Sequence, residues 1–364
     1  MSTITAKNIK KYNFSAGPAI LAASVIKEAA AAVSDFNGIG LSILEISHRS
    51  KGFVDVMNEA TSLARELLGL PEDYEVLFLT GGASSQFFMS ALNLLDSEET
   101  ACYVDTGSWS AKAIKEAKLY GNVNILSSSK EAAYNYIPKG YEIPGDAKYL
   151  HLTSNNTIYG TQYHSWPETT IPIVCDMSSD IFSRPLPINR FGMIYAGAQK
   201  NMGPAGTTMV IIRKDMLGRV SRTIPTMLNY QTHIDKNSAF NTPPVYPIYV
   251  CMLTLRWLKE QGGLEAMEKQ NKAKAAIIYN EIDSNPLFKG TTAIEDRSLM
   301  NVTFVMNDDS LTSAFMDIAT AAGCVGLAGY RSVGGFRASI YNAMPAEGVQ
   351  VLADLMKEFA HKHG

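Results

Sequence analysis

The sequence has 364 residues, of which 46% are hydrophobic and 18% charged, with 32 Lys and Arg against 35 Asp and Glu. This composition excludes a disordered chain and is typical of a globular protein with room for two domains. The near balance of charges, without a dense basic run, argues against a nucleic-acid partner. The longest apolar run, 245–255, is too short to span a bilayer, so we expect no membrane partner either.

The four cysteines, Cys102, Cys175, Cys251 and Cys324, lie far apart and in no spacing that binds zinc. We therefore expect free, buried thiols and no metal site. The polar segment 1–11 lacks the apolar stretch of a signal peptide, and free thiols suit a reducing compartment. These features predict a cytoplasmic protein.

The first part of the chain alternates between helical and strand patterns. The spacing of apolar residues predicts helices over 24–36, 54–70, 84–95, 109–120 and 245–255, and strands over 75–79, 100–105, 123–126, 148–152, 171–176, 192–196 and 207–213. Strands that are separated by helices indicate a mainly parallel sheet with helices on both faces.

The pattern changes beyond Gly262 and Gly263. Here we expect helices over 264–283, 311–322 and 345–361, and strands over 301–306, near 325 and over 336–341. The sequence thus predicts an α/β fold, with a large domain over 16–262 and a smaller α+β domain formed by 1–15 and 263–364.

Two residues at predicted strand ends suggest the chemistry. Lys200 follows an apolar strand and is surrounded by small residues and glycines, so its amine is expected to be poorly solvated, with a lowered pKa. Asp176 ends another strand, and ligands collect at the carboxyl ends of parallel strands. A neutral lysine can form a Schiff base, and a carboxylate can hold a pyridine nitrogen protonated. The pair therefore suggests pyridoxal 5′-phosphate, although each residue alone is more often an ordinary loop or turn residue.

Three further strand ends add to this constellation. Ala83 and Ser84 follow a glycine turn at a helix start, where backbone N–H groups can bind a phosphate; the alternative is an ordinary helix cap. Trp109 can stack on a planar ring or anchor its helix in the core. The polar turn Thr153-Ser154-Asn155-Asn156-Thr157 can donate a hydrogen bond to a ring oxygen or be a plain loop.

Anion-binding side chains occur beside glycine-rich or polar turns. Arg49 follows His48, and Tyr330, Arg331 and Arg337 lie in one glycine-rich segment. Guanidinium groups bind carboxylates and phosphates in a bidentate manner, so several arginines suggest a substrate with more than one anionic group. A solvated surface position is the alternative for each arginine.

Together these segments resemble the phosphoserine aminotransferase family, part of the class V aminotransferases with the type I pyridoxal-phosphate fold. The motifs that carry the resemblance extend over almost the whole chain: Asn13-Phe14-Ser15-Ala16-Gly17-Pro18, Ser47-His48-Arg49, Asp176-Met177-Ser178-Ser179, Gln199-Lys200-Asn201, Asn241-Thr242-Pro243-Pro244 and Arg337-Ala338-Ser339-Ile340-Tyr341-Asn342.

The resemblance implies a role for each of these residues. Lys200 would carry the cofactor as a Schiff base, Asp176 would contact the pyridine nitrogen, and Trp109 would stack on the ring. Thr157 and Gln199 would lie near ring or phosphate oxygens. Ala83 and Ser84 would bind the phosphate, together with Asn241 and Thr242 from the second subunit of a homodimer. Arg337 would bind the substrate α-carboxylate, and His48, Arg49, Tyr330 and Arg331 would face its distal anionic group.

The implied reaction moves an amino group from L-glutamate to a phosphorylated 2-oxo acid, 3-phosphohydroxypyruvate, giving 2-oxoglutarate and O-phospho-L-serine. Lys200 would act as general base and acid. The family also acts on 3-hydroxy-2-oxo-4-phosphonooxybutanoate in making vitamin B6 precursors, and the residues leave this second substrate open. Tyr330 stands where many members have histidine, and Ser84 where some have arginine, which we expect to affect affinity and not the type of reaction.

Two other interpretations remain open on the sequence. A cysteine desulfurase of the same fold would need a reactive thiol, for which Cys324 is the candidate, but its apolar neighbours predict a raised pKa. A non-catalytic scaffold that kept the fold would not hold the cofactor, and the purified protein would be colourless.

Overall fold

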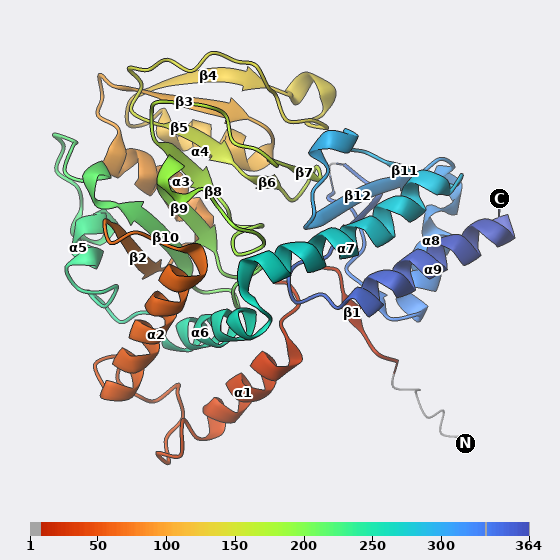
Figure 1. Cartoon of the computed structure of the whole chain (residues 1–364), viewed down its shortest axis with the longest axis horizontal. Helices are drawn as coiled ribbons and strands as arrows, with labels where there is room; N and C mark the ends of the chain where they lie inside the picture. Colours follow the sequence, from red (N-terminus) through yellow and green to blue (C-terminus); the bar gives the residue numbers. More distant parts are fainter. Residues whose placement is uncertain (1–8, 332, 364) are drawn as a thin grey trace.

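The computed structural model describes residues 9–331 and 333–363 (Figure 1). Residues 1–8, which the sequence analysis assigned to the small domain and to the polar start of the chain, lie outside the described residues. Within the described ranges, no helix is both long and apolar enough to cross a membrane.

A seven-stranded sheet forms the centre of the larger part of the molecule, in the order β2-β10-β9-β8-β5-β3-β4. Its strands are β2 (Tyr74–Leu79), β3 (Thr100–Asp105), β4 (Asn122–Ser128), β5 (Leu150–Thr153), β8 (Ile173–Asp176), β9 (Phe191–Gly197) and β10 (Thr208–Arg213). β10 runs antiparallel to its two neighbours, β2 and β9, and the other pairs of neighbouring strands in this sheet are parallel. The mainly parallel α/β fold is therefore confirmed.

Helices cover both faces of this sheet (Figure 1). α1 (Ala23–Ser34), α2 (Lys51–Leu68) and α6 (Val245–Glu260) contribute to the hydrophobic core on one face, and α3 (Gly82–Leu94), α4 (Ser108–Ala117) and α5 (Tyr230–Ile234) to the core on the other. The strands of this sheet are apolar on both faces, so their sequences do not alternate between polar and apolar residues. In β2, for example, Val76 and Phe78 enter the first core while Leu77 and Leu79 enter the second.

A second group of elements packs beside the large sheet. It contains an antiparallel sheet of β11 (Phe288–Gly290), β12 (Asn301–Met306) and β14 (Phe336–Ser339), with helices α7 (Gly263–Ser284), α8 (Thr312–Ala321) and α9 (Ala346–His363). The short strands β1 (Tyr12–Asn13) and β13 (Cys324–Val325) pair in parallel, and β6 (Asn155–Asn156) and β7 (Thr161–Gln162) form a hairpin at the junction. This small unit has its own hydrophobic core, which includes Tyr12 and Phe14.

Helix α7 joins the two parts (Figure 1). Leu264 and Met267 in its first turns belong to a core of the large sheet, whereas Ala275, Ile278 and Ile282 belong to the core of the small unit. The domain boundary near residue 262 stays a prediction. The change from one core to the other occurs along α7, between Met267 and Ala275.

Candidate active site

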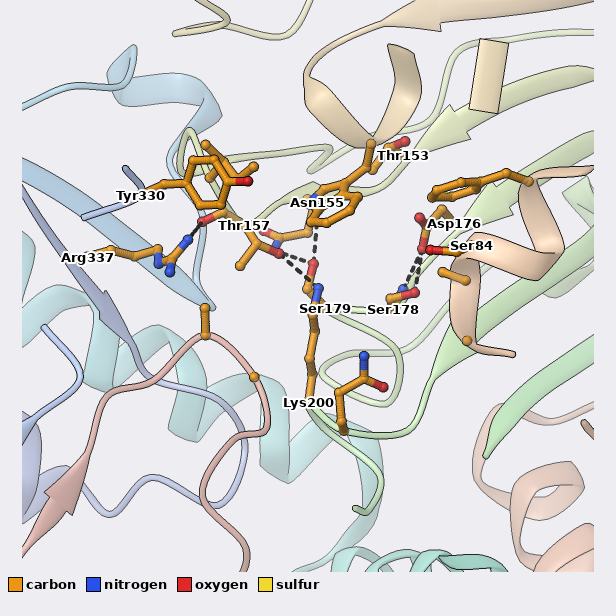
Figure 2. Close-up of a pocket in the computed structure, with 18 residues that line it drawn as sticks. Ser84, Thr153, Asn155, Thr157, Asp176, Ser178, Ser179, Lys200, Tyr330 and Arg337 are labelled. Carbon is orange, nitrogen blue, oxygen red and sulfur yellow. Dashed lines mark hydrogen bonds between the residues drawn. The ribbon is translucent and has the colours of Figure 1, made fainter. Parts of the chain in front are cut away.

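A cavity of about 330 Å³ lies at the carboxyl ends of the central strands, where the small unit meets the large sheet. It contains most of the residues that the sequence analysis singled out: Ala83, Ser84, Trp109, Thr157, Asp176, Gln199, Lys200, Tyr330 and Arg337. Because these residues come from separate segments of the chain, the shared pocket is a property of the fold. We call this cavity the active-site pocket (Figure 2).

Lys200 stands in the middle of the pocket, between Asp176 on one side and Arg337 on the other (Figure 2). It follows β9, and its Nζ donates a hydrogen bond to Thr157 Oγ1 at 3.1 Å. Burial lowers the pKa of Lys200, with the Asp176 carboxylate opposing this shift and the Arg337 guanidinium adding to it. The site therefore favours a neutral amine more than water does.

Asp176 is the last residue of β8, and its carboxylate is buried. Its Oδ1 accepts hydrogen bonds from the Ser178 backbone N at 2.9 Å and from Ser178 Oγ at 2.6 Å. Burial raises the pKa of Asp176, whereas the Ser178 hydrogen bonds and the Lys200 charge lower it. The serine thus orients the carboxylate and favours its ionised form.

Helix α3 brings a second anion-binding feature to the pocket. Its first turn, with Gly82, Ala83 and Ser84, lines the cavity directly after β2. The preceding Gly81 has φ 96°, and a Cβ there would lie 2.0 Å from Ser85 Oγ, so only glycine fits this turn. The N–H groups of a first helical turn have no acceptors within the helix and lie at its positive end, which suits a phosphate.

Trp109 is half-buried in the first turn of α4 and lines the pocket. Its indole Nε1 is buried without a hydrogen-bond partner among the described residues. The Lys112 Nζ lies 4.5 Å from the ring centroid. The side chain is thus available to a planar ligand, and it also packs against its own helix.

Arg337, on β14, is the cation that the small unit contributes to the pocket. Its Nη1 is 3.4 Å from the Thr157 carbonyl oxygen, and its Nε is buried without a partner among the described residues. Burial lowers the pKa of Arg337 from its high ordinary value. A guanidinium with a free donor is suited to a carboxylate ligand. Tyr330 lines the same side of the pocket.

The other predicted residues lie elsewhere in this chain. His48 and the exposed Arg49 belong to the segment between α1 and α2, and the exposed Arg331 is not among the residues that line the pocket. Asn241 and Thr242 line a smaller cavity of about 150 Å³ on the other side of the turn before α3, with Gly81 and Ser85. A single copy of the chain therefore does not bring all the predicted residues together.

The pocket also contains polar residues beyond the predicted site residues. Ser178, Ser179, Asn155 and Thr153 line it, and Asn155 Nδ2 donates to Ser179 Oγ at 2.8 Å (Figure 2). The signal for Ser178 was present, because an aspartate that is followed two residues later by serine commonly bonds the backbone of that serine. Asn155 belongs to the same polar turn as Thr157, but nothing local in the sequence indicates its contact with Ser179.

The thiol required by the desulfurase interpretation is not in this pocket. Cys324 is 1% exposed and belongs to the core of the small unit. Burial raises its pKa to about 11. All four cysteines are free and buried, as expected.

Comparisons with known proteins agree with these features. The class-V aminotransferase family model matches residues 11–352. Curated phosphoserine aminotransferases from Parabacteroides distasonis and Flavobacterium johnsoniae are each 59% identical to the chain, over 98% and 97% of its length and 100% of theirs.

Solved structures extend this similarity to three dimensions. A phosphoserine aminotransferase from Bacillus circulans subsp. alkalophilus is 45% identical, with a TM-score of 0.95 over 98% of this chain and 99% of that one. A pyridoxal-phosphate-bound phosphoserine aminotransferase from Trichomonas vaginalis is 38% identical, with a TM-score of 0.91 over 96% and 100%. The chain is a pyridoxal-phosphate-dependent enzyme that belongs to the phosphoserine aminotransferase family of the class V aminotransferases.

Proposed function

We propose that this enzyme transfers the amino group of L-glutamate to 3-phosphohydroxypyruvate, giving 2-oxoglutarate and O-phospho-L-serine for serine biosynthesis. The observation that carries the proposal is the position of the Lys200 amine in one pocket with the Asp176 carboxylate and the Arg337 guanidinium. The family relationship supports the substrates, since relatives with 59% identity are phosphoserine aminotransferases.

The donors and acceptors of the pocket fit pyridoxal 5′-phosphate. Asp176 would contact the pyridine nitrogen, because its carboxylate is held in place by Ser178. The free N–H groups at the start of α3, with Ala83 and Ser84, would hold the phosphate. Trp109 would cover one face of the ring, and Thr157 and Gln199 would bond its oxygens. When bound, the cofactor supplies an electron-accepting ring that stabilises negative charge at the substrate Cα.

Lys200 would carry the proton in this reaction. Its amine lies near the centre of the pocket, and burial lowers its pKa, so that it can accept a proton from the substrate Cα and return it. The Thr157 hydroxyl, 3.1 Å from Nζ, would orient the amine. The Asp176 carboxylate limits the fall in the pKa of Lys200, so the amine can both accept a proton and give it back.

Arg337 would bind the α-carboxylate common to both substrates. Its buried Nε and its position beside Thr157 support this role. Tyr330 and Arg331 would meet the distal group, which is a carboxylate in glutamate and a phosphate in the phosphorylated 2-oxo acid. Arginine donors accept either anion.

We further propose that the enzyme is a homodimer with shared active sites. A run of large apolar side chains is exposed between residues 26 and 54, namely Ile26, Val33, Ile39, Leu41, Leu44 and Val54. His48 and Arg49 lie in this same stretch, and α1 projects from the body of the molecule (Figure 1). A second copy would cover these apolar groups, and His48, Arg49, Asn241 and Thr242 would reach the pocket of that copy.

The free, buried state of all four thiols supports a reducing compartment, and we propose the cytoplasm.

The function is tested with Lys200→Ala. We expect the wild-type protein to be yellow, to be fixed to its cofactor at Lys200 by borohydride, and to form O-phospho-L-serine from L-glutamate and 3-phosphohydroxypyruvate. Lys200→Ala should lose the borohydride-fixed mass and nearly all activity. Lys139→Ala, which removes a surface lysine paired with Asp296, is the control and should retain both. Normal activity of Lys200→Ala, or a colourless wild type that cannot be reconstituted, would overturn the proposal.

A further inference from the structure

The pocket is assembled from two parts of the fold that have separate hydrophobic cores. Lys200 and Asp176 belong to the large sheet, whereas Arg337 lies on β14 of the small unit. A substrate that binds Arg337 through its carboxylate can react at Lys200 only if the two parts keep a fixed separation. The contacts that determine this separation are therefore part of the active site's construction.

One buried amide lies at the centre of these contacts. The side chain of Asn301, on β12, is fully buried. Its Oδ1 accepts a hydrogen bond from Asn155 Nδ2 at 2.7 Å, and its Nδ2 donates to Ser339 Oγ at 2.9 Å and to the Tyr341 hydroxyl at 3.1 Å. An amide is needed here, because the position uses both acceptor and donor atoms.

Two of the three partners of Asn301, Asn155 and Tyr341, lead to the active-site pocket. Asn155 lines the pocket and donates from the same Nδ2 to Ser179 Oγ, also in the lining. Tyr341 donates its hydroxyl to the carbonyl oxygen of Ala16, a further lining residue, at 2.7 Å. The Asn301 amide thus connects the small unit to the large-sheet side of the pocket through hydrogen bonds shielded from water.

The same residue also faces the strand that carries Arg337. β12 and β14 are antiparallel, with Asn301 opposite Ser339 and Thr303 opposite Arg337. Arg337 and Ser339 are two residues apart on one strand, so their side chains project from the same face. A second contact ends at the lysine turn, where the backbone N of Asn342 donates to Asn201 Oδ1 at 3.0 Å.

We propose that Asn301 is a positioning residue, which through Asn155, Ser339 and Tyr341 holds Arg337 at a fixed place relative to Lys200. Asn301 does not touch the substrate and acts through the arginine. This inference rests on the proposed role of Arg337 as the carboxylate-binding residue. It assigns a function to the Tyr341 end of the last sequence motif, which otherwise has none in the reaction.

A purely structural role would produce a different result, and Asn285 provides the matched control. It is a buried asparagine of the same unit, and its Nδ2 donates to the Met356 carbonyl oxygen at 3.1 Å, joining the end of α7 to α9. Asn285→Ala removes a comparable hydrogen-bonded amide without a connection to the pocket. It should lower the unfolding temperature while leaving the KM for L-glutamate unchanged.

The experiment compares holoenzymes of the wild type, Asn301→Ala, Asn285→Ala, Arg337→Ala and the double variant Asn301→Ala/Arg337→Ala. For Asn301→Ala we expect kcat/KM for L-glutamate to fall by roughly 10- to 100-fold, as for a catalytic group displaced by about 1 Å. The visible absorbance of the bound cofactor should not change. The double variant should be little worse than Arg337→Ala alone, because the asparagine acts through the arginine.

Hydrogen exchange gives a readout that does not depend on activity. Backbone amides of 336–342 should exchange faster in Asn301→Ala than in Asn285→Ala. Should Asn301→Ala fail to fold, Tyr341→Phe removes a single hydroxyl from the same network and should show the same changes to a smaller degree.

The outcomes separate this inference from the proposed function. If Arg337→Ala leaves kcat/KM unchanged, the role of the arginine itself is wrong. If Arg337→Ala is impaired but Asn301→Ala behaves like Asn285→Ala, or if the two losses simply add in the double variant, the positioning role is wrong and the amide serves stability alone.

Discussion

At the scale of single residues, burial acts on the two central ionisable groups in opposite directions. It lowers the pKa of Lys200 and raises that of Asp176, so each neutral form is favoured, while the charge of each group favours ionisation of the other. Ser178 opposes the shift at Asp176 through two hydrogen bonds to Oδ1, but burial is the larger effect and the pKa of Asp176 stays raised. Each group therefore limits the pKa shift that burial produces in the other, and such a pair of shifted groups in one cleft is typical of a catalytic site.

Cys324 is buried, and we expect it to have no role in the reaction. The substitution Cys324→Ser tests this expectation. The thiol is 1% exposed, and its pKa is raised to about 11, so almost no thiolate exists at neutral pH. We expect the variant to keep full transaminase activity, with a modest loss of thermal stability from placing a hydroxyl in an apolar core. Steady-state kinetics and a melting curve check this. A large loss of kcat with an unchanged melting curve would revive the desulfurase interpretation.

The sequence predicted those residues whose chemistry is visible locally. Lys200 and Asp176 each follow an apolar strand, so their type and position are enough to suggest a role. Asn155 and Asn301 could not be predicted in this way, because their roles depend on a contact between residues 146 positions apart. The sequence around a polar residue does not reveal its hydrogen-bond partner when that partner comes close only in the folded chain.

At the scale of elements, helix α7 forms hydrogen bonds to the segment that follows β14. The Lys274 side chain of this helix is 3% exposed and has no carboxylate partner among the described residues. Its Nζ instead donates to three carbonyl oxygens, those of Ile340 at 3.0 Å, Tyr341 at 2.7 Å and Asn342 at 3.4 Å. These contacts explain why β14 ends at Ser339 and not at 341, as the sequence analysis expected, since the carbonyls turn toward the lysine.

This contact predicts a pH dependence of stability. Burial lowers the pKa of Lys274 from 10.5 to about 7. Between these values the unfolded chain binds the proton and the folded chain does not, so the free energy of unfolding rises with pH, by at most about 1.4 kcal/mol per pH unit. Below pH 7 the lysine is protonated in both the folded and the unfolded chain. The free energy of unfolding is then lowered by the full cost of burying the charged amine.

Lys274→Met tests this contact. The variant should lose these hydrogen bonds, of which a neutral amine can donate two, and be less stable, and its urea midpoint should rise less than that of the wild type between pH 7 and pH 9. Lys272→Met is the control, because Lys272 is an exposed neighbour on the same helix, paired with Glu268. Parallel pH dependences for the wild type and Lys274→Met would show that the lysine stays charged when buried.

The elements differ in how well they could be predicted, for physical reasons. Long helices and buried strands have a periodicity that the sequence reveals, and α2 and β3 lie where it was expected. The direction of β10 was not predicted. The segment 198–207 that precedes it is shorter than the crossover of about a dozen residues that a parallel strand needs, so β10 folds back on β9. A strand was expected near 325, where β13 lies, but the two-residue strand β1 is too short to show any period.

At the scale of the whole molecule, the proposed shared site requires residues that a single chain does not bring together. The pocket contains the residues that we propose for the cofactor ring, whereas His48, Arg49, Asn241 and Thr242 lie outside its lining. The sequence motifs suggest that these residues bind a ligand. They do not show whether each residue acts in the pocket of its own chain or of a second copy, because that depends on the surface that the second copy covers. The exposed apolar side chains of 26–54 identify the surface that we propose as this interface.

The double variant Leu41→Glu/Leu44→Glu tests the dimer and its shared site together. The two leucines are 49% and 62% exposed in the single chain. In a two-fold interface each substitution occurs twice, so the variant would bury four carboxylates that have no partners, and the dimer should dissociate. We expect light scattering to report a monomer, and activity per chain to fall at least about tenfold, since the loss of even one charge-assisted hydrogen bond to a phosphate typically costs about 1.5–3 kcal/mol.

Leu119→Glu/Ile294→Glu provides the matched control, with two exposed apolar residues replaced outside the 26–54 stretch. It should keep the mass and activity of the wild type. A Leu41→Glu/Leu44→Glu protein that stays dimeric would place the interface on another surface. A fully active monomer would contradict the shared site itself, because residues such as Arg49, far from the pocket of their own chain, would then have no route to the substrate.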